Sequence, residues 1–140
     1  MNVAFYVPNL GDQKLVNEIV TEVQINKENI DSATIFFDNI GPFPFGTSIS
    51  LFNSTEIWSF VGKLLLFTDS CWLKTKSIIN KFNTYFYYDS VNMKNTLVLL
   101  DMVNDNCKVI AKNKEDADKF YRLTGKEVAG ICEDLVDVTK

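Results

Sequence analysis

The chain has 140 residues, of which 46% are hydrophobic and 23% charged, with a formal net charge of −4 and no histidine. This composition is typical of one globular domain, here residues 1–140, with an apolar core and little disorder. The negative charge disfavours direct nucleic-acid binding. The missing histidine excludes Ser-His-Asp and Cys-His catalysis, together with any histidine general base.

The start of the chain, its apolar runs and its cysteines bear on location and on metal binding. The first residues lack the basic region of a signal peptide, and apolar runs such as 64–67 are too short to span a bilayer. Three isolated cysteines, Cys71, Cys107 and Cys132, form no CxxC motif and predict small buried hydrophobes in a reducing compartment. We therefore expect a cytoplasmic protein without a metal, a cofactor or membrane association.

Strands and helices are predicted to alternate in the first half of the chain. Pro8 ends the first predicted strand, and Asp12 is the expected N-cap of a helix whose apolar residues recur with helical spacing from Leu15 to Val23. The predicted elements are strand, helix, strand, irregular loop, short strand, helical turn and strand, over residues 2–7, 13–26, 33–37, 38–46, 48–52, 53–60 and 63–67.

The same alternation continues to the end of the chain. Thr68 to Ser70 are predicted to cap one helix, and Gly125 to end another. The predicted elements are helix, strand, helix, strand, helix and strand, over residues 69–82, 84–88, 93–103, 107–111, 114–124 and 127–131. Strands that alternate with helices imply right-handed crossovers and a mainly parallel sheet. The fold class is therefore predicted to be α/β, as a three-layer Rossmann-like domain.

The loops that follow the strands carry the candidate ligand-binding residues, because such sheets bind ligands at the carboxyl ends of their strands. Asn9, Gly11 and Asp12 follow the first predicted strand, and Asp38 and Asn39 follow the second. A glycine at a helix N-terminus can cradle an anion, although Asp12 would repel phosphate and a plain capping turn is the alternative. The sequence has neither GxGxxG nor a P-loop motif.

The loop after the second predicted strand is unusually apolar for a loop. Ile40, Phe43 and Phe45 stand there among two prolines and two glycines. Aromatic faces next to the carboxylate of Asp38 suit a sugar or a base. Alternatively, these three residues form an interface with a second copy of the chain or with another protein.

Three further clusters allow a functional and a structural interpretation. A local basic patch or a solvated helix face is expected from Lys74, Lys76 and Lys81. Stacking on bases or packing in the core is expected from Tyr85, Tyr87 and Tyr88. A metal site or a solvated tail is expected from Glu133, Asp134 and Asp137. Asp69 and Asp89 are additional carboxylates at the carboxyl edge, but their order does not fit a response-regulator receiver.

The C-terminal third resembles the end of the N-terminal domain of GT-B glycosyltransferases. The resemblance rests on the strand at 107–113, the helix at 115–124 and the segment Gly125-Lys-Glu-Val-Ala-Gly-Ile-Cys-Glu-Asp134. Residues 52–63 are similar to a segment of glycosyltransferase-like proteins from tailed phages of marine bacteria.

The resemblance implies an acceptor-side half-domain, because a GT-B enzyme holds its nucleotide-sugar mainly through a second Rossmann domain. It implies a sugar or sugar-acceptor ligand, and either a donor-domain partner chain or self-association. The chain departs from the family in lacking a glycine-rich first loop and a histidine base, so we expect no sugar transfer by the chain alone. The alternative function is a non-enzymatic interaction or oligomerisation module that uses loop 40–45.

Overall fold

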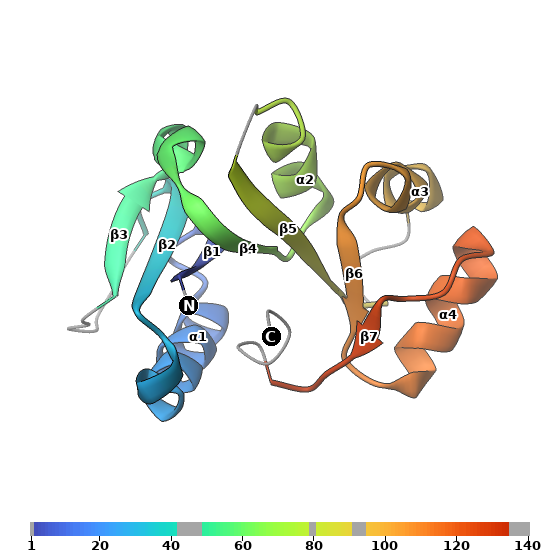
Figure 1. The fold of residues 1–140 in the computed structure, drawn as a ribbon, viewed down its shortest axis with the longest axis horizontal. Coiled ribbons are helices and arrows are strands. Elements are labelled where there is room, and N and C mark those ends of the chain that lie inside the picture. Colours follow the sequence, from blue (N-terminus) through green and yellow to red (C-terminus); the bar gives the residue numbers. More distant parts are fainter. Residues whose placement is uncertain (1, 42–48, 79–80, 91–94, 135–140) are drawn as a thin grey trace.

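A parallel β-sheet runs through the centre of the molecule in the computed structural model (Figure 1), which describes residues 2–41, 49–78, 81–90 and 95–134. The elements in chain order are β1 (Asn2–Asn9), α1 (Gln13–Ile25), η1 (Lys27–Asn29), β2 (Ser32–Asn39), β3 (Ser50–Asn53), η2 (Ser54–Ser59), β4 (Val61–Leu66), α2 (Asp69–Thr75), β5 (Lys81–Tyr88), α3 (Thr96–Asn104), β6 (Lys108–Ala111), α4 (Lys114–Thr124) and β7 (Gly130–Ile131). The predicted alternation of strands and helices is confirmed.

The strand order identifies the class of fold. The described residues form a seven-stranded sheet in the order β3-β2-β1-β4-β5-β6-β7, and each neighbouring pair is parallel. This confirms a three-layer, Rossmann-like α/β fold, with a sheet that is parallel throughout the described strands. Successive strands extend the sheet in one direction from β1 to β3 and in the other from β4 to β7. The topological switch point therefore lies between β1 and β4.

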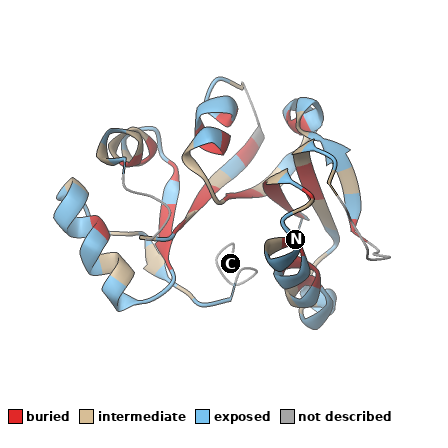
Figure 2. Ribbon diagram, turned by 180° about the vertical axis from the view of Figure 1, so that it is seen from behind, coloured by how far each residue is buried: buried red, intermediate tan, exposed pale blue. Residues whose placement is uncertain are grey.

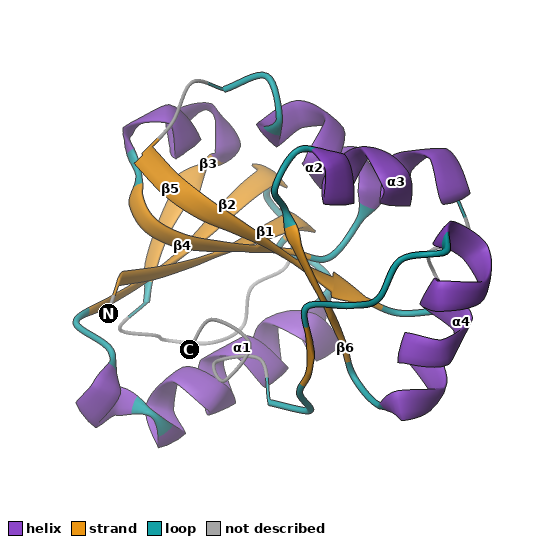
Figure 3. Ribbon diagram, turned by 45° about the vertical axis from the view of Figure 1, so that its right-hand side comes forward, coloured by secondary structure: helices purple, strands orange, loops and turns teal. Residues whose placement is uncertain are grey.

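Helices cover both faces of the sheet, as Figures 1 and 3 show. α1 lies on one face, where Val16, Ile19 and Val23 pack with Phe5 and Leu65. On the other face, η2, α2, α3 and α4 supply side chains to a second cluster around the strands. The change of face follows from the reversal at the switch point, because right-handed crossovers that run in opposite directions lie on opposite faces.

Burial on both faces explains the apolar sequence of the central strands. Residues Val3 to Val7 of β1 and Leu64 to Leu66 of β4 are all fully buried. Figure 2 shows the buried residues concentrated in the central strands, between helices whose outer faces are exposed. A strand that is buried on both faces needs apolar residues at successive positions. A strand with one solvent-exposed face needs them only at every second position.

Two strand boundaries differ from the prediction for identifiable reasons. β1 continues through Pro8 to Asn9 instead of ending before the proline. The pairing of β1 with β4 stops at Tyr6, so the absence of an N–H group on Pro8 removes no hydrogen bond between these two strands. The predicted last strand at 127–131 is reduced to Gly130 and Ile131, which are the residues that pair with β6.

The predicted helix at 69–82 is wrong in its second half. α2 ends at Thr75, and Phe82 belongs to β5. In β5, Phe82 points to the same face as Phe86 and Tyr88, and all three join the cluster beneath α2 and α3. The apolar residues from Phe82 onward thus recur with the period of a strand. The helical period that the sequence analysis assigns to this segment ends before them.

The cysteines match the prediction in two cases of three. Cys71 and Cys107 are buried, and burial raises the pKa of their thiols to about 11 and about 12. Cys132, which follows β7, is only half-buried. None of the helices in the described ranges is long and apolar enough to cross a bilayer.

Candidate functional site

The carboxyl edge of the sheet at the switch point is where ligands bind in open α/β sheets. The predicted residues Asn9, Gly11 and Asp12 connect β1 to α1 at this edge, and Asp38 and Asn39 end β2 beside it. The register pairs Asn9 with Asn39. The five predicted residues therefore lie at one edge of the sheet, and their side chains show how that edge is used.

The loop between β1 and α1 is closed by its own hydrogen bonds. The Gly11 N–H donates to Asn9 Oδ1 at 2.7 Å, and the Asp12 N–H donates to the Asn9 carbonyl at 3.1 Å. Asp12 is the N-cap of α1, as predicted, because its Oδ1 accepts from the Leu15 N–H at 3.3 Å. The amide of Gly11, which was the candidate for anion binding, is thus already satisfied.

The end of β2 packs directly against this loop. The Leu10 N–H donates to the Asn39 carbonyl at 3.2 Å. A Cβ placed on Gly41 would lie 2.4 Å from the Gly11 nitrogen and 2.6 Å from Asn9 Oδ1. Backbone therefore occupies the space in which a phosphate would meet the glycine. The structure brings Asn9, Gly11 and Asn39 together as a packed turn.

Asp38 belongs to a separate polar cluster on the opposite face from α1, the face that also carries Phe36 and α2. Its Oδ1 accepts hydrogen bonds from Tyr6 Oη at 2.7 Å and from Ser54 Oγ. Its Oδ2 accepts from Lys74 Nζ at 2.9 Å and forms an ion pair with it. We call Tyr6, Asp38, Ser54 and Lys74 the Asp38 cluster.

The electrostatics of the Asp38 cluster favour a charged pair. Burial acts to raise the pKa of Asp38, but the hydrogen bonds from Ser54, Tyr6 and Lys74 outweigh it and hold the pKa below its ordinary value. Burial, and then the hydrogen bond to Asp38, raises the pKa of Tyr6. The hydrogen bond to Asp38 raises the pKa of Lys74. With both oxygens engaged and a lowered pKa, Asp38 is a poor general base.

A small cavity of about 140 Å³ lies beside the Asp38 cluster. Tyr6, Ser54 and Lys74 contribute to its wall, together with Thr55 and the apolar Ile57. The side chain of Lys74 is 59% exposed, whereas that of Asp38 is 18% exposed. The ammonium group of Lys74 is therefore the part of the cluster that a ligand can reach from solvent.

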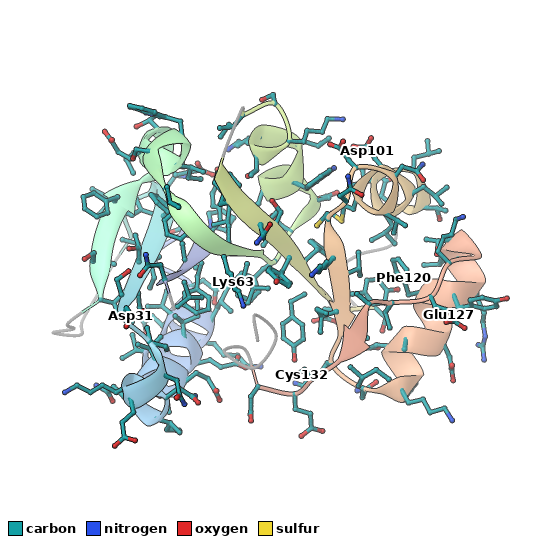
Figure 4. All side chains as sticks on the ribbon, in the orientation of Figure 1. Asp31, Lys63, Asp101, Phe120, Glu127 and Cys132 are labelled. Carbon is teal, nitrogen blue, oxygen red and sulfur yellow. The ribbon has the colours of Figure 1, made fainter. Side chains whose placement is uncertain are left out.

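Sequence reasoning missed three members of the Asp38 cluster. Tyr6 stands in an apolar strand, Ser54 was interpreted as part of a helix cap, and Lys74 was one of three lysines in a basic patch or solvated face. The structure pairs Lys74 with Asp38 and pairs Lys76 with Asp101 at 2.9 Å. Figure 4 labels Asp101 on α3, beside α2. The described lysine side chains of this patch are thus neutralised by carboxylates.

The other sequence candidates have mainly structural roles where the structure describes them. Tyr85 and Tyr88 are buried in the core, and Tyr87 Oη donates to the carbonyls of Cys132 and Glu133 at 3.2 Å each. Within residues 2–41, 49–78, 81–90 and 95–134, no group of three or more acidic, cysteine or histidine side chains is placed to hold a metal ion. Asp137 and the side chain of Lys81 lie outside the described part.

The apolar loop after β2 is described only at its start. Ile40 is 81% exposed, as an interface residue would be in a free chain. Phe43 and Phe45 lie outside the described residues.

A groove of about 560 Å³ lies between α4 and β7. Its wall includes Lys114, Asp118 and Glu127, so it carries charges of both signs, and Tyr121 and Ile131 contribute apolar surface. The groove lies at the outer edge of the sheet, away from the switch point. It therefore shares no residue with the predicted site.

Comparison with protein-family models, with curated proteins and with solved structures finds no match to this chain.

Proposed function

We propose that this chain is an acceptor-side half-domain of the glycosyltransferase GT-B type. In this proposal it binds a saccharide acceptor at the carboxyl edge, and a second domain supplies the nucleotide-sugar. The observation that carries the proposal is the closed loop at the switch point. Asn9 Oδ1 accepts from the Gly11 N–H, and Gly41 packs against the same backbone. A Rossmann-like domain that has filled its own anion-binding position is suited to a role that needs no nucleotide.

The chemistry of the carboxyl edge supports the absence of transfer by the chain alone. An acceptor hydroxyl needs a general base to become a nucleophile. The sequence has no histidine, and the carboxylate of Asp38 is engaged by three donors. In this proposal the second domain therefore contributes the base as well as the donor sugar.

The acceptor is proposed to bind at the carboxyl edge, beside the exposed ammonium group of Lys74. Lys74 Nζ can donate to a sugar hydroxyl while it keeps its bond to Asp38, because an ammonium group has three donors. Asn39 and Asp12 are exposed at the same edge. These groups suit the hydroxyls of a saccharide, and a neutral ligand avoids the repulsion that Asp12 would exert on a phosphate.

Titration of the ¹⁵N-labelled chain tests this proposal. UDP- and GDP-sugars are expected to leave the amide spectrum unchanged, whereas a panel of oligosaccharide acceptors should shift amides around Ser54 and Lys74. Lys74→Ala should weaken that binding several-fold. The matched control is Lys119→Ala, which removes a lysine paired with Glu115 on α4. Tight binding of a nucleotide-sugar by the chain alone, or no acceptor response at this edge, contradicts the proposal.

A second candidate function is self-association through the loop after β2, and the exposed side chain of Ile40 favours it. We propose the variant Ile40→Ser, alone and combined with Phe43→Ser and Phe45→Ser, and measurement of the mass in solution by sedimentation. A wild-type dimer that dissociates in these variants supports self-association through this loop. A wild-type monomer, or a dimer that the variants leave intact, contradicts it.

A further inference from the structure

A groove of about 340 Å³ lies at the amino ends of the strands, on the face that carries α2. Side chains of β1, β2, β3, η2 and the start of β4 line it. None of the residues of the Asp38 cluster is among its lining residues. We call it the amino-edge groove.

The groove follows from how little of β2 is covered on this face. α1, on the opposite face, has 13 residues, whereas η2 has six. Ile57 of η2 is buried over the sheet. Ser32, at the start of β2, is exposed, and Thr34 is half-buried. The short 3₁₀ helix η2 thus leaves the start of β2 open on this face.

Phenylalanines form the apolar wall of the groove. The ring centroids of Phe36 lie 6.4 Å from Phe52 and 5.8 Å from Phe60, and Phe60 lies 6.2 Å from Phe82 in the core. The backbone of Gly62 allows the approach of Phe60, since a Cβ there would lie 2.9 Å from Phe60 Cζ. Phe52 is 49% exposed, so one ring of a fixed aromatic row remains accessible to a ligand.

Hydroxyl, amide and carboxylate groups complete the wall of the groove. Ser32 Oγ donates to Asn2 Oδ1 at 3.0 Å, and Ser59 Oγ donates to the Glu56 carbonyl at 2.8 Å. Thr34 adds a third hydroxyl to the wall. Among the described residues that line the groove, Glu56 is the charged one, and no lysine or arginine is present. This charge opposes phosphates, carboxylates and nucleotides.

We propose that the amino-edge groove binds a neutral saccharide of one or two pyranose rings. The apolar C–H face of one ring packs on Phe52, and the ring hydroxyls bond to Ser32, Thr34 and Glu56. The volume is at the lower end of the range of about 300–1,000 Å³ that small-molecule pockets occupy. A quaternary ammonium ligand would also suit aromatic rings and a carboxylate, but it would make no hydrogen bond to the hydroxyls of Ser32 and Thr34.

The groove and the proposed acceptor site share no lining residue, so a saccharide can bind in the groove whether or not the proposed function holds. Under that function the groove would hold a second part of a glycan away from its reacting end. Under any other function it is a saccharide site in its own right.

The test is an NMR titration of the full ¹⁵N-labelled chain with maltose, cellobiose, lactose and N,N′-diacetylchitobiose. At least one sugar should shift the amides of Thr34 and Phe52. Phe52→Ala should weaken binding about ten-fold, because a truncated aromatic loses its stacking contact. Tyr121→Ala, which removes an exposed aromatic from α4, is the matched control. Thr34→Val removes one hydroxyl at constant shape and should weaken binding several-fold in a folded chain.

The outcomes separate this inference from the proposed function. Shifts confined to Ser54 and Lys74 support the carboxyl-edge site and overturn the groove. Shifts at Thr34 and Phe52 that Phe52→Ala abolishes support the groove, whatever happens at the carboxyl edge. Binding of inorganic phosphate or tetramethylammonium in preference to every sugar overturns it, as does a dimer that buries Phe52.

Discussion

The carboxyl and amino edges of the sheet use their polar residues differently. At the carboxyl edge, the side chains of Asp12, Thr68 and Asn113 each accept an N–H from the first turn of the helix that follows, and Asp38 accepts three further donors. At the amino edge, Ser32 and Thr34 line an open groove.

The difference follows from the topology. In a parallel sheet each crossover helix begins at the carboxyl edge, so its unpaired N–H groups lie there and need acceptors. Polar residues at that edge are therefore required by the fold before any ligand is considered. A polar residue at the amino edge meets no helix N-terminus, so it is not required there as an N-cap.

The largest predicted effect tests whether the aromatic wall of the amino edge is fixed by the backbone. Gly62 has φ +146°, and a Cβ there would lie 2.5 Å from the Asn2 carbonyl oxygen. We expect Gly62→Ala to reduce the free energy of unfolding by about 3 kcal/mol, as measured by urea denaturation. Gly130→Ala is the control, because its Cβ would meet Ile110 Cδ1 at an ordinary 3.5 Å. Equal stability of the two variants would mean that the backbone at Gly62 can shift away from Asn2, and so does not fix the aromatic wall.

The next effect tests whether the Asp38 cluster is a structural ion pair. Asp38→Asn should lower the free energy of unfolding at pH 7 by about 1.5–3 kcal/mol, the usual range for hydrogen bonds to a charged group. Because the folded-state pKa of Asp38 is lowered, its contribution is complete above the ordinary pKa of a carboxyl group. It is then lost as the pH falls through the folded-state value.

Urea denaturation of both proteins at pH 7, 5 and 3 measures this dependence. The wild type should lose its advantage over Asp38→Asn between pH 4 and the acid limit of folding. An advantage that stays constant with pH would contradict the assignment of a half-buried, charged Asp38.

The elements could be predicted from the sequence because burial on both faces leaves a local pattern. Val3 to Val7 are apolar in succession, and Val16, Ile19, Val20 and Val23 recur with helical spacing. Caps are local in the same way, since Asp12 bonds Leu15 within one turn. Features that depend on neighbouring positions in the sequence could therefore be predicted. The errors of the prediction lie at the ends of elements, as at Phe82.

The site was predicted less well because its partners are distant in sequence. Asp38 meets Tyr6, Ser54 and Lys74 only after β1, η2 and α2 have assembled. The amino-edge groove exists because η2 is shorter than β2, and no sequence motif indicates this difference in length. The edge itself could be predicted, since Asn9, Asp12 and Asp38 do stand at carboxyl ends of strands.

A smaller effect tests whether the carboxyl-edge caps are structural. The N-cap Asn113 accepts from the Asp116 N–H at 2.9 Å. Asn113→Ala should cost about 1 kcal/mol of the free energy of unfolding. Asn17→Ala, at an exposed position inside α1, should leave stability unchanged or raise it slightly, since alanine is the better helix former. A cost shared by both variants would point to a general effect of losing asparagine instead of a cap.

The smallest effect tests whether Thr34 at the amino edge is dispensable for the fold. Thr34 is half-buried in β2 and lines the groove, and valine has the same shape and suits a strand equally well. We expect Thr34→Val to change the free energy of unfolding by less than about 0.5 kcal/mol. Thr75→Val is the matched comparison, because the buried Thr75 hydroxyl donates to the Cys71 carbonyl at 2.7 Å, and its loss should cost about 1 kcal/mol. If Thr34→Val were the more damaging of the two, the Thr34 hydroxyl would serve the fold, and the contrast between the two edges would fail at Thr34.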